Sequence, residues 1–311
     1  MIDAVFVLGP TASGKTALGI EIAKVIPAEV ISIDSALVYR HMDVGSAKPT
    51  QEEMAGVPHH LIDVRDPFES YSAADFVRDC TRLIKEIKAR GKLPLIVGGT
   101  MLYAKALKEG LNQMPTSDLE VRRSVEAEAA EIGWPGMHDK LAEVDPVTAA
   151  RLMPNDSQRI SRALEVYRQT GKPISWYQAQ EQKGSDFKFL TLGLLPSDRK
   201  VLHDRIAKRF DIMLEQGFLD EVKRLMAMPQ LDREWPSMRA VGYRQAIDYL
   251  LGEIDHERFM IAGVAATRQL AKRQMTWMRS MDDIHLMDPL TENVVEKALM
   301  LIDQAQAEAE A

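Results

Sequence analysis

The sequence predicts an α/β protein whose core is a parallel sheet flanked by helices and interrupted by an all-helical insertion. Short apolar runs alternate with stretches of helical periodicity, which is typical of parallel strands joined by crossover helices. A glycine-rich phosphate-binding motif at residues 9–16 directly follows the first apolar run. Residues 114–183 show helical patterns but no convincing strand. We therefore expect a P-loop NTPase-like core of residues 1–113 and 184–311, with a helical insertion domain at 114–183.

The core elements follow from apolar runs and stop signals. Buried strands are expected at residues 4–8, 28–33, 93–100 and 187–196. A helix is expected over 71–91, because Ser72 can cap it, apolar residues recur at helical spacing and Gly91 stops it. The chain from 197 to about 280 is expected to be mostly helical, with a glycine-containing break at "RAVGYRQ". An acidic, alanine-rich tail follows.

The insertion is expected to consist of three helices. The first, over 117–133, opens with a capping box from Ser117 to Glu120 and closes at Gly133. A second covers "MHDKLAEV", and a third covers "SQRISRALEVYRQTGKP", where a glycine and a proline act as stop signals.

Charge is distributed unevenly along the chain. The formal net charge is −7, but residues 281–311 hold eight acids and a single base, so the other 280 residues are balanced. Local basic faces are therefore possible on the body, and such faces decide RNA binding.

Composition points to an ordinary globular protein, with 46% hydrophobic and 27% charged residues. The sequence contains no run of about 18 apolar residues, so no membrane span is expected. The first strand begins too early to leave room for a signal peptide. Cys80 is the single cysteine, which excludes a disulfide framework or a multi-cysteine zinc site and fits a reducing cytoplasm. We expect Cys80 to be a small buried apolar side chain, and we expect a monomer, because no exposed apolar helix repeat stands out.

The phosphate motif supplies groups suited to a pyrophosphate. Glycines let backbone N–H groups turn inward, and the following helix N-terminus adds partial positive charge. Lys15 can neutralise phosphate oxygens, and the Thr16 hydroxyl can hold Mg²⁺. The motif residues expected to bind diphosphate are Gly9, Pro10, Thr11, Ala12, Ser13, Gly14, Lys15 and Thr16.

The motif alone does not identify the ligand. The second strand ends at Asp34, which suits a Mg²⁺-linked acid, but the strand at 93–100 offers no acid, and no N-K-x-D guanine signature is present. Asp34 lies where ligands gather in parallel sheets. It can be a second-shell Mg²⁺ partner, a general base or a helix N-cap, and these roles stay open.

Eight motifs occur in one order between Val5 and Arg279, namely "GPTASGKT", "SIDSALVYRHMDVGSAKP", "PHHLIDVRDP", "YSAADF", "LIVGGTMLY", "NDSQRISRALEVY", "RAVGYRQ" and "ATRQLAKRQMTWMR". Together they resemble the tRNA dimethylallyltransferases, also called tRNA isopentenyltransferases, in their compact bacterial form without a zinc-finger extension. The resemblance implies that the loop binds dimethylallyl diphosphate, with Mg²⁺, and that the acceptor is the N6 amine of the adenosine 3′-adjacent to the anticodon of tRNA.

The resemblance also implies roles for single residues. Asp34 would be the general base, and Thr100 and Arg122 would lie beside the reacting groups. The segments that would contact the tRNA anticodon stem-loop comprise Asp34, Ser35, Ala36, Leu37, Gln158, Arg159, Ile160, Ser161, Arg162, Arg239, Ala240, Val241, Gly242, Tyr243, Arg244, Lys272, Arg273, Gln274, Met275, Thr276, Trp277, Met278 and Arg279. Leu37 stands where some family members have glutamine, which puts a polar contact there in doubt.

Two other functions remain open at this stage. A P-loop kinase would use ATP, with Arg205 and Arg209 as lid arginines, and an RNA-binding switch would need no transfer chemistry. Trp277 can stack on a base or pack in the core. The adjacent His59 and His60 favour an ordinary loop role over metal binding.

Overall fold

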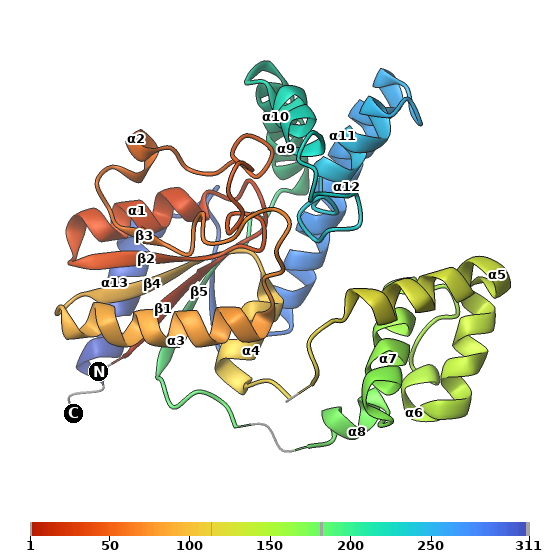
Figure 1. Cartoon of the computed structure of the whole chain (residues 1–311). Helices are drawn as coiled ribbons and strands as arrows, with labels where there is room; N and C mark the ends of the chain where they lie inside the picture. Colours follow the sequence, from red (N-terminus) through yellow and green to blue (C-terminus); the bar gives the residue numbers. More distant parts are fainter. Residues whose placement is uncertain (1, 113, 181–182, 309–311) are drawn as a thin grey trace. The chain divides into compact units, whose positions relative to one another are not determined.

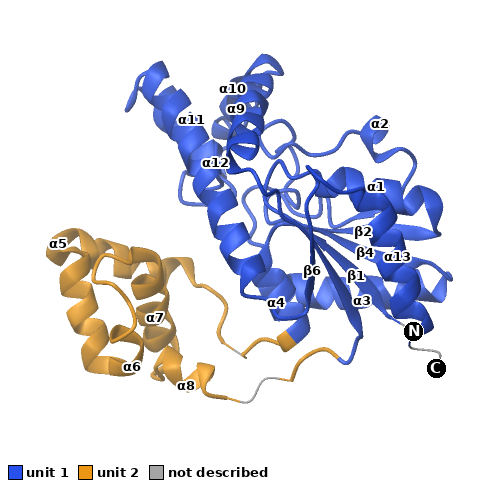
Figure 2. Cartoon of the chain, turned by 180° about the vertical axis from the view of Figure 1, so that it is seen from behind, with its two compact units in different colours: residues 1–108, 186–311 blue, residues 109–185 orange. Residues whose placement is uncertain are grey.

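The computed structural model describes residues 2–112, 114–180 and 183–308 of the chain. These form two compact units (Figure 2). Unit 1 comprises Met1–Lys108 and Asp186–Ala311, and unit 2 comprises Glu109–Ser185.

Unit 1 is built on one six-stranded sheet with the order β3-β2-β4-β1-β5-β6, and all of its strand pairs are parallel (Figure 1). The predicted α/β class is therefore confirmed. The strands are β1 (Ala4–Leu8), β2 (Ala28–Ile33), β3 (His59–His60), β4 (Leu93–Gly98), β5 (Phe189–Leu194) and β6 (Ile284–Met287).

The helices of unit 1 follow the same chain order, and the last residue of α4 already belongs to unit 2. They are α1 (Lys15–Val25), α2 (Gln51–Met54), α3 (Ala73–Ala89), α4 (Met101–Glu109), α9 (Arg199–Glu215), α10 (Phe218–Met226), α11 (Tyr243–Leu250), α12 (His256–Arg279) and α13 (Val294–Ala307). None of the helices in the described ranges is long and apolar enough to cross a membrane.

Alternation along the strands divides the core into two layers. On β1, Phe6 packs with the apolar stripe of α3, whereas Val5 and Val7 pack with residues of α1 and α13. Because successive strand residues point to opposite faces, the fully buried strand β1 needs apolar residues at every position. The expected helix over 71–91 is confirmed, with Ser72 as its N-cap in a capping box with Asp75 and with Cys80 fully buried.

One expectation for unit 1 was wrong. His59 and His60 form the edge strand β3 beside β2, where a loop was expected. The acidic tail contributes to the core, because β6 extends the sheet and α13 buries Ala298 and Ile302 against it. Most of its described acids are exposed, and the apolar residues between them pack.

The secondary structure of the described residues of unit 2 is all helical, with α5 (Leu119–Val144), α6 (Pro146–Ala149), α7 (Ser157–Thr170) and α8 (Ile174–Gln178). Its own core includes Val125, Leu141, Ile160 and Leu164. Gly133, with φ 73° and ψ 164°, breaks α5 where a helix end was expected. The capping box was wrong, because Asp118 caps α5 by accepting from the N–H groups of Glu120 and Val121.

Candidate functional site

The carboxyl ends of three neighbouring strands, β2, β4 and β1, meet at one edge of the sheet in unit 1. Thr100, just after β4, joins this end of the sheet to the end of β2. Its N–H donates to the carbonyl of Ile33 at 3.1 Å, and its hydroxyl accepts from the N–H of Ser35 at 3.1 Å. On the other side, the N–H of Gly9 donates to the carbonyl of Gly98 at 3.3 Å. The three loops therefore form one continuous surface.

The phosphate loop has the backbone that its glycines predict. Gly14 has φ 92°, in the left-handed region that glycine adopts without strain. A Cβ at Gly9 would lie 2.4 Å from the Ser13 hydroxyl oxygen, so this close approach also requires glycine. The Lys15 ammonium donates to the carbonyl of Pro10 at 3.2 Å. The buried Ser13 hydroxyl has no hydrogen-bond partner within the described residues, which leaves a donor in the loop for a ligand.

Gln274 of α12 braces the phosphate loop from the far end of the chain. Its side-chain oxygen accepts from the N–H of Thr11 at 2.9 Å, and its side-chain nitrogen donates to the carbonyl of Gly99 at 2.9 Å. One amide thus joins the loop after β1 to the loop after β4. The resemblance places Gln274 among RNA contacts, but its amide is engaged in this brace. Glutamine on a helix gives no sequence signal for such a role.

Replacing Gln274 with leucine is expected to lower the free energy of unfolding by about 1–3 kcal/mol, because it leaves two partly buried backbone groups without partners. Thermal or urea unfolding of the purified protein measures this change. Gln269→Leu is the matched control, because Gln269 is exposed on the same helix. Equal stability of the two variants would show that the brace contributes nothing.

Charged groups converge beside the loop. Burial lowers the pKa of the Lys15 ammonium to about 8; the Asp34 carboxylate opposes this shift and the Arg209 guanidinium adds to it. Burial likewise lowers the pKa of Arg209, against the attraction of Asp34 and Glu53. Two cations and one carboxylate therefore share one environment. Arg209, not the exposed Arg205, is the arginine of α9 that belongs to this site.

Asp34 is partly buried directly after β2. One of its carboxylate oxygens accepts a hydrogen bond from the N–H of Ala36 at 2.8 Å. Within the described part of the chain, the other oxygen accepts no hydrogen bond. Asp34 does not cap a helix, which excludes the helix N-cap among its three possible roles.

Arg122 lies in unit 2, where it pairs with Glu126 at 2.9 Å. Its role beside the diphosphate stays a prediction.

The segments expected to contact RNA contain both exposed and buried side chains. The buried ones pack in the cores, so any RNA contact they make has to come from their backbone; they are Ile160, Ser161, Gly242, Tyr243, Met275 and Met278. The exposed ones are Ser35, Gln158, Arg159, Arg239, Arg244, Lys272, Arg273, Thr276, Trp277 and Arg279. Ala36, Leu37, Arg162, Ala240 and Val241 are half-buried. Trp277 is 38% exposed, which leaves its ring available for stacking.

Unit 2 contains a groove of about 590 Å³ on its own surface. Three arginines line it, Arg151, Arg159 and Arg162, together with Gln158 and Gln178. Such a basic, amide-bearing groove suits a phosphate backbone. Arg151 lies outside the segments named from the sequence, because its place beside Arg159 depends on the packing of α6 against α7 and α8.

The described residues contain no cluster of three or more His, Cys, Asp or Glu side chains arranged to hold a metal. The His60 imidazole instead donates a hydrogen bond to the buried Glu29 carboxylate at 2.7 Å. Mg²⁺ usually takes one or two protein oxygens and completes its shell with substrate phosphates and water. The Thr16 hydroxyl in the first turn of α1 and the Asp34 carboxylate fit that requirement.

Comparisons with known proteins agree with one another. Residues 37–281 match a family model described as IPP transferase. A tRNA dimethylallyltransferase of Chromobacterium violaceum is 60% identical over 91% of this chain and 87% of its own, and one of a Janthinobacterium species is 57% identical over 98% of each. Among solved structures, a tRNA isopentenylpyrophosphate transferase from Bacillus halodurans is 39% identical, with a TM-score of 0.71 and 98% and 99% of the two chains covered. A eukaryotic dimethylallyltransferase acting on tRNA is 28% identical, with a TM-score of 0.80 and 98% and 79% covered.

Proposed function

Because the chain belongs to the IPP transferase family, we propose that it transfers a dimethylallyl group from dimethylallyl diphosphate to tRNA and releases diphosphate. The acceptor we propose is the N6 amine of the adenosine 3′-adjacent to the anticodon. The observation that carries this proposal is the meeting of Lys15, Asp34 and Thr100 at one edge of the sheet, where an anion site and a carboxylate adjoin.

The phosphate loop would hold the leaving group. Breaking the allylic carbon–oxygen bond places negative charge on the diphosphate, and stabilising that developing charge is the largest gain available. The N-terminus of α1, the Lys15 ammonium and the Arg209 guanidinium would supply this stabilisation in this chain. Mg²⁺ held by Thr16 would add charge neutralisation. The unpartnered Ser13 hydroxyl offers one further donor.

Asp34 would act as the general base. The exocyclic amine of adenine is a weak nucleophile, because its lone pair is delocalised into the ring. A carboxylate that accepts its proton as the new carbon–nitrogen bond forms contributes about 10²- to 10⁴-fold. Thr100 keeps its hydroxyl proton free while its oxygen accepts from Ser35, so it can donate to the diphosphate or its bridging oxygen. Arg122 of unit 2 would be a further cation on the diphosphate.

The RNA has to present its adenine edge to this site. Extruding the base from the anticodon loop costs a few kcal/mol of stacking. The exposed basic residues on α12 and α7 would hold the flanking backbone, and we propose that the enzyme works as a monomer in the cytoplasm.

Labelled donors test the function directly. Purified protein, Mg²⁺ and unmodified tRNA would receive either radiolabelled dimethylallyl diphosphate or γ-labelled ATP. We expect label from the prenyl donor at the single adenosine after the anticodon. Consumption of ATP without label in the RNA would overturn the proposal in favour of a kinase.

Arg159→Ala and Lys272→Ala are each expected to weaken tRNA binding and to reduce the slope of log K against log salt by about 1, the effect of one lost phosphate contact. Both side chains are exposed, although Arg159 also pairs with Asp156 at 3.0 Å. Binding titrations at several salt concentrations measure the slope. The control is Lys85→Ala on α3, where an exposed lysine lies outside every segment expected to meet RNA. An unchanged slope would remove the tested residue from the interface.

A further inference from the structure

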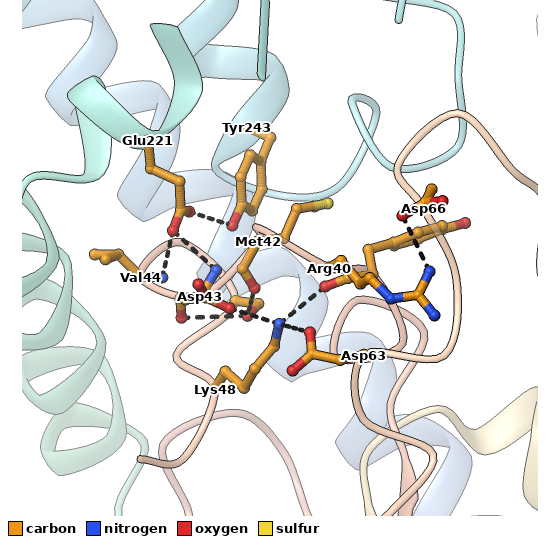
Figure 3. A network of polar contacts seen from close by, with 11 residues as sticks. Arg40, Met42, Asp43, Val44, Lys48, Asp63, Asp66, Glu221 and Tyr243 are labelled. Carbon is orange, nitrogen blue, oxygen red and sulfur yellow. Dashed lines mark hydrogen bonds and ion pairs between the residues drawn. The ribbon is translucent and has the colours of Figure 1, made fainter. Parts of the chain in front are cut away.

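Glu221 of α10 is a buried carboxylate that the reaction described above does not use. Its side chain accepts four hydrogen bonds, three of them from consecutive backbone N–H groups (Figure 3). One oxygen accepts from Asp43 at 2.8 Å and Val44 at 2.7 Å, and the other accepts from Gly45 at 3.0 Å and from the Tyr243 hydroxyl at 2.7 Å. Glu221 is only 2% exposed. Successive inward N–H groups form an anion nest, and here the anion belongs to the protein itself.

We call residues 34–48 the β2 loop, because they follow β2 and begin with Asp34. Lys48 holds this loop from inside. Its ammonium donates to the carbonyl of Tyr39 at 2.9 Å and to the carboxylates of Asp43 at 2.6 Å and Asp63 at 2.5 Å (Figure 3). The Lys48 side chain is 6% exposed. A buried cation thus closes the loop on itself, and the buried carboxylate of Glu221 ties it to α10.

Shape as well as charge fixes the contact. A Cβ at Gly45 would lie 2.2 Å from the Phe218 ring and 2.6 Å from the Tyr243 ring, so only glycine fits there. Burial and the adjacent Glu221 carboxylate raise the pKa of Tyr243. Its hydroxyl therefore stays protonated and donates. These contacts fix the position of the β2 loop relative to α10 and α11.

The carboxylate joins Tyr243 to residues 43–45 of the β2 loop, and the family resemblance assigns other residues of this loop to RNA. The β2 loop carries residues 34–37, and Tyr243 belongs to the segment 239–244, whose Arg239 and Arg244 are exposed on either side of it. Residues 43–45 of the β2 loop and Tyr243 are about 200 residues apart in the chain, yet they donate to the same side chain. We propose that Glu221 is a positioning residue that holds the β2 loop and the segment 239–244 in one register for the tRNA acceptor. This inference rests on the proposed function.

Glu221→Gln tests the proposal, because the amide keeps the shape of the carboxylate but turns one acceptor oxygen into a donor. In either orientation that donor would face at least one backbone N–H group, so at least one bond is lost and two donors are brought together. We expect the Kd for an anticodon stem-loop RNA to rise 10- to 100-fold, with the KM for dimethylallyl diphosphate within about twofold of wild type. Tyr243→Phe removes one of the four bonds, so it should shift the Kd in the same direction but less.

Asp220→Asn is the matched control, because Asp220 precedes Glu221 and its exposed carboxylate pairs with the exposed Lys223 at 3.1 Å. It should leave both constants unchanged. A purely structural role of Glu221 would lower thermal stability and affect the two substrates alike. A raised Kd for RNA with an unchanged KM for dimethylallyl diphosphate therefore distinguishes a positioning role from a purely structural one.

Hydrogen exchange gives a readout that needs no activity. The amides of residues 43–45 are expected to exchange at least tenfold faster in Glu221→Gln, with those of β1 and β4 unchanged. Normal RNA affinity in that variant, with or without faster exchange, would overturn the inference while leaving the proposed function intact. Failure of the wild type to transfer label to RNA would instead overturn the proposed function, and the inference would fall with it.

Discussion

Asp34→Ala is expected to lower turnover by roughly 10²- to 10⁴-fold while the Kd for tRNA stays within a few-fold, because the variant removes the proton acceptor and little binding surface. Single-turnover transfer with saturating RNA and donor isolates this step from binding. Asp34 lies at the end of β2, where Thr100 and Ser35 hold the backbone by their own hydrogen bond. The loss of one side chain should therefore leave the surrounding loop in place.

Asp34→Asn is the decisive companion variant. Its amide oxygen can still accept from the N–H of Ala36, as the carboxylate does at 2.8 Å, but the amide cannot take a proton from adenine. Equal loss in both variants supports the general base. Near-normal turnover in Asp34→Asn would assign Asp34 to the turn alone, and a collapse of RNA binding in Asp34→Ala would point the same way.

Lys15→Ala is expected to lower kcat/KM for dimethylallyl diphosphate by about 10²- to 10³-fold, which is typical of losing one preorganised group that stabilises developing negative charge. Initial rates at varied donor concentration measure it. Lys24→Ala on the same helix is the control, because its exposed ammonium pairs with Glu21 and lies outside the motif. Equal rates for wild type and Lys15→Ala would exclude the phosphate loop as the diphosphate site.

The pH dependence of the wild type gives an independent check on Lys15. With a pKa of about 8, the free enzyme carries the ammonium below that pH and loses it above. Since kcat/KM reports groups of the free enzyme, it should fall about tenfold per pH unit above about pH 8. Lys15→Arg should remove this fall, because a guanidinium stays protonated. A profile that is unchanged in the arginine variant would assign the fall to another group.

Much of the fold could be predicted from local sequence. Strands 4–8 and 28–33 were placed to the residue, because short runs rich in apolar and β-branched residues, followed by glycine or an acid, are typical of buried parallel strands. The strand β6 was missed. Its four residues include the exposed His285 and lie among acids, so neither alternation nor an apolar run marks them. These residues form a strand because they pair with β5, and the local sequence pattern does not indicate that pairing.

The site, too, contains residues that could be predicted from the sequence and residues that could not. The strand-end argument brings Asp34, Lys15 and Thr100 together, and the hydrogen bonds of the structure show that their loops meet. Gln274 and Glu221 could not be predicted, because each is a polar residue on an amphipathic helix that looks solvent-facing in sequence. Their partners lie far along the chain, so only the tertiary structure reveals that they hold the loops of the site.

The brace from Gln274 to Thr11 spans 263 residues, which matters for the nascent chain. The phosphate motif leaves the ribosome first, yet its brace emerges among the last residues. Unit 2 is a continuous stretch between β4 and β5. It can therefore fold before β5 and β6 have been synthesised and the sheet is complete. A chain released before α12 would carry an intact motif without its brace. Premature termination should therefore yield products that the motif alone would wrongly mark as able to bind diphosphate.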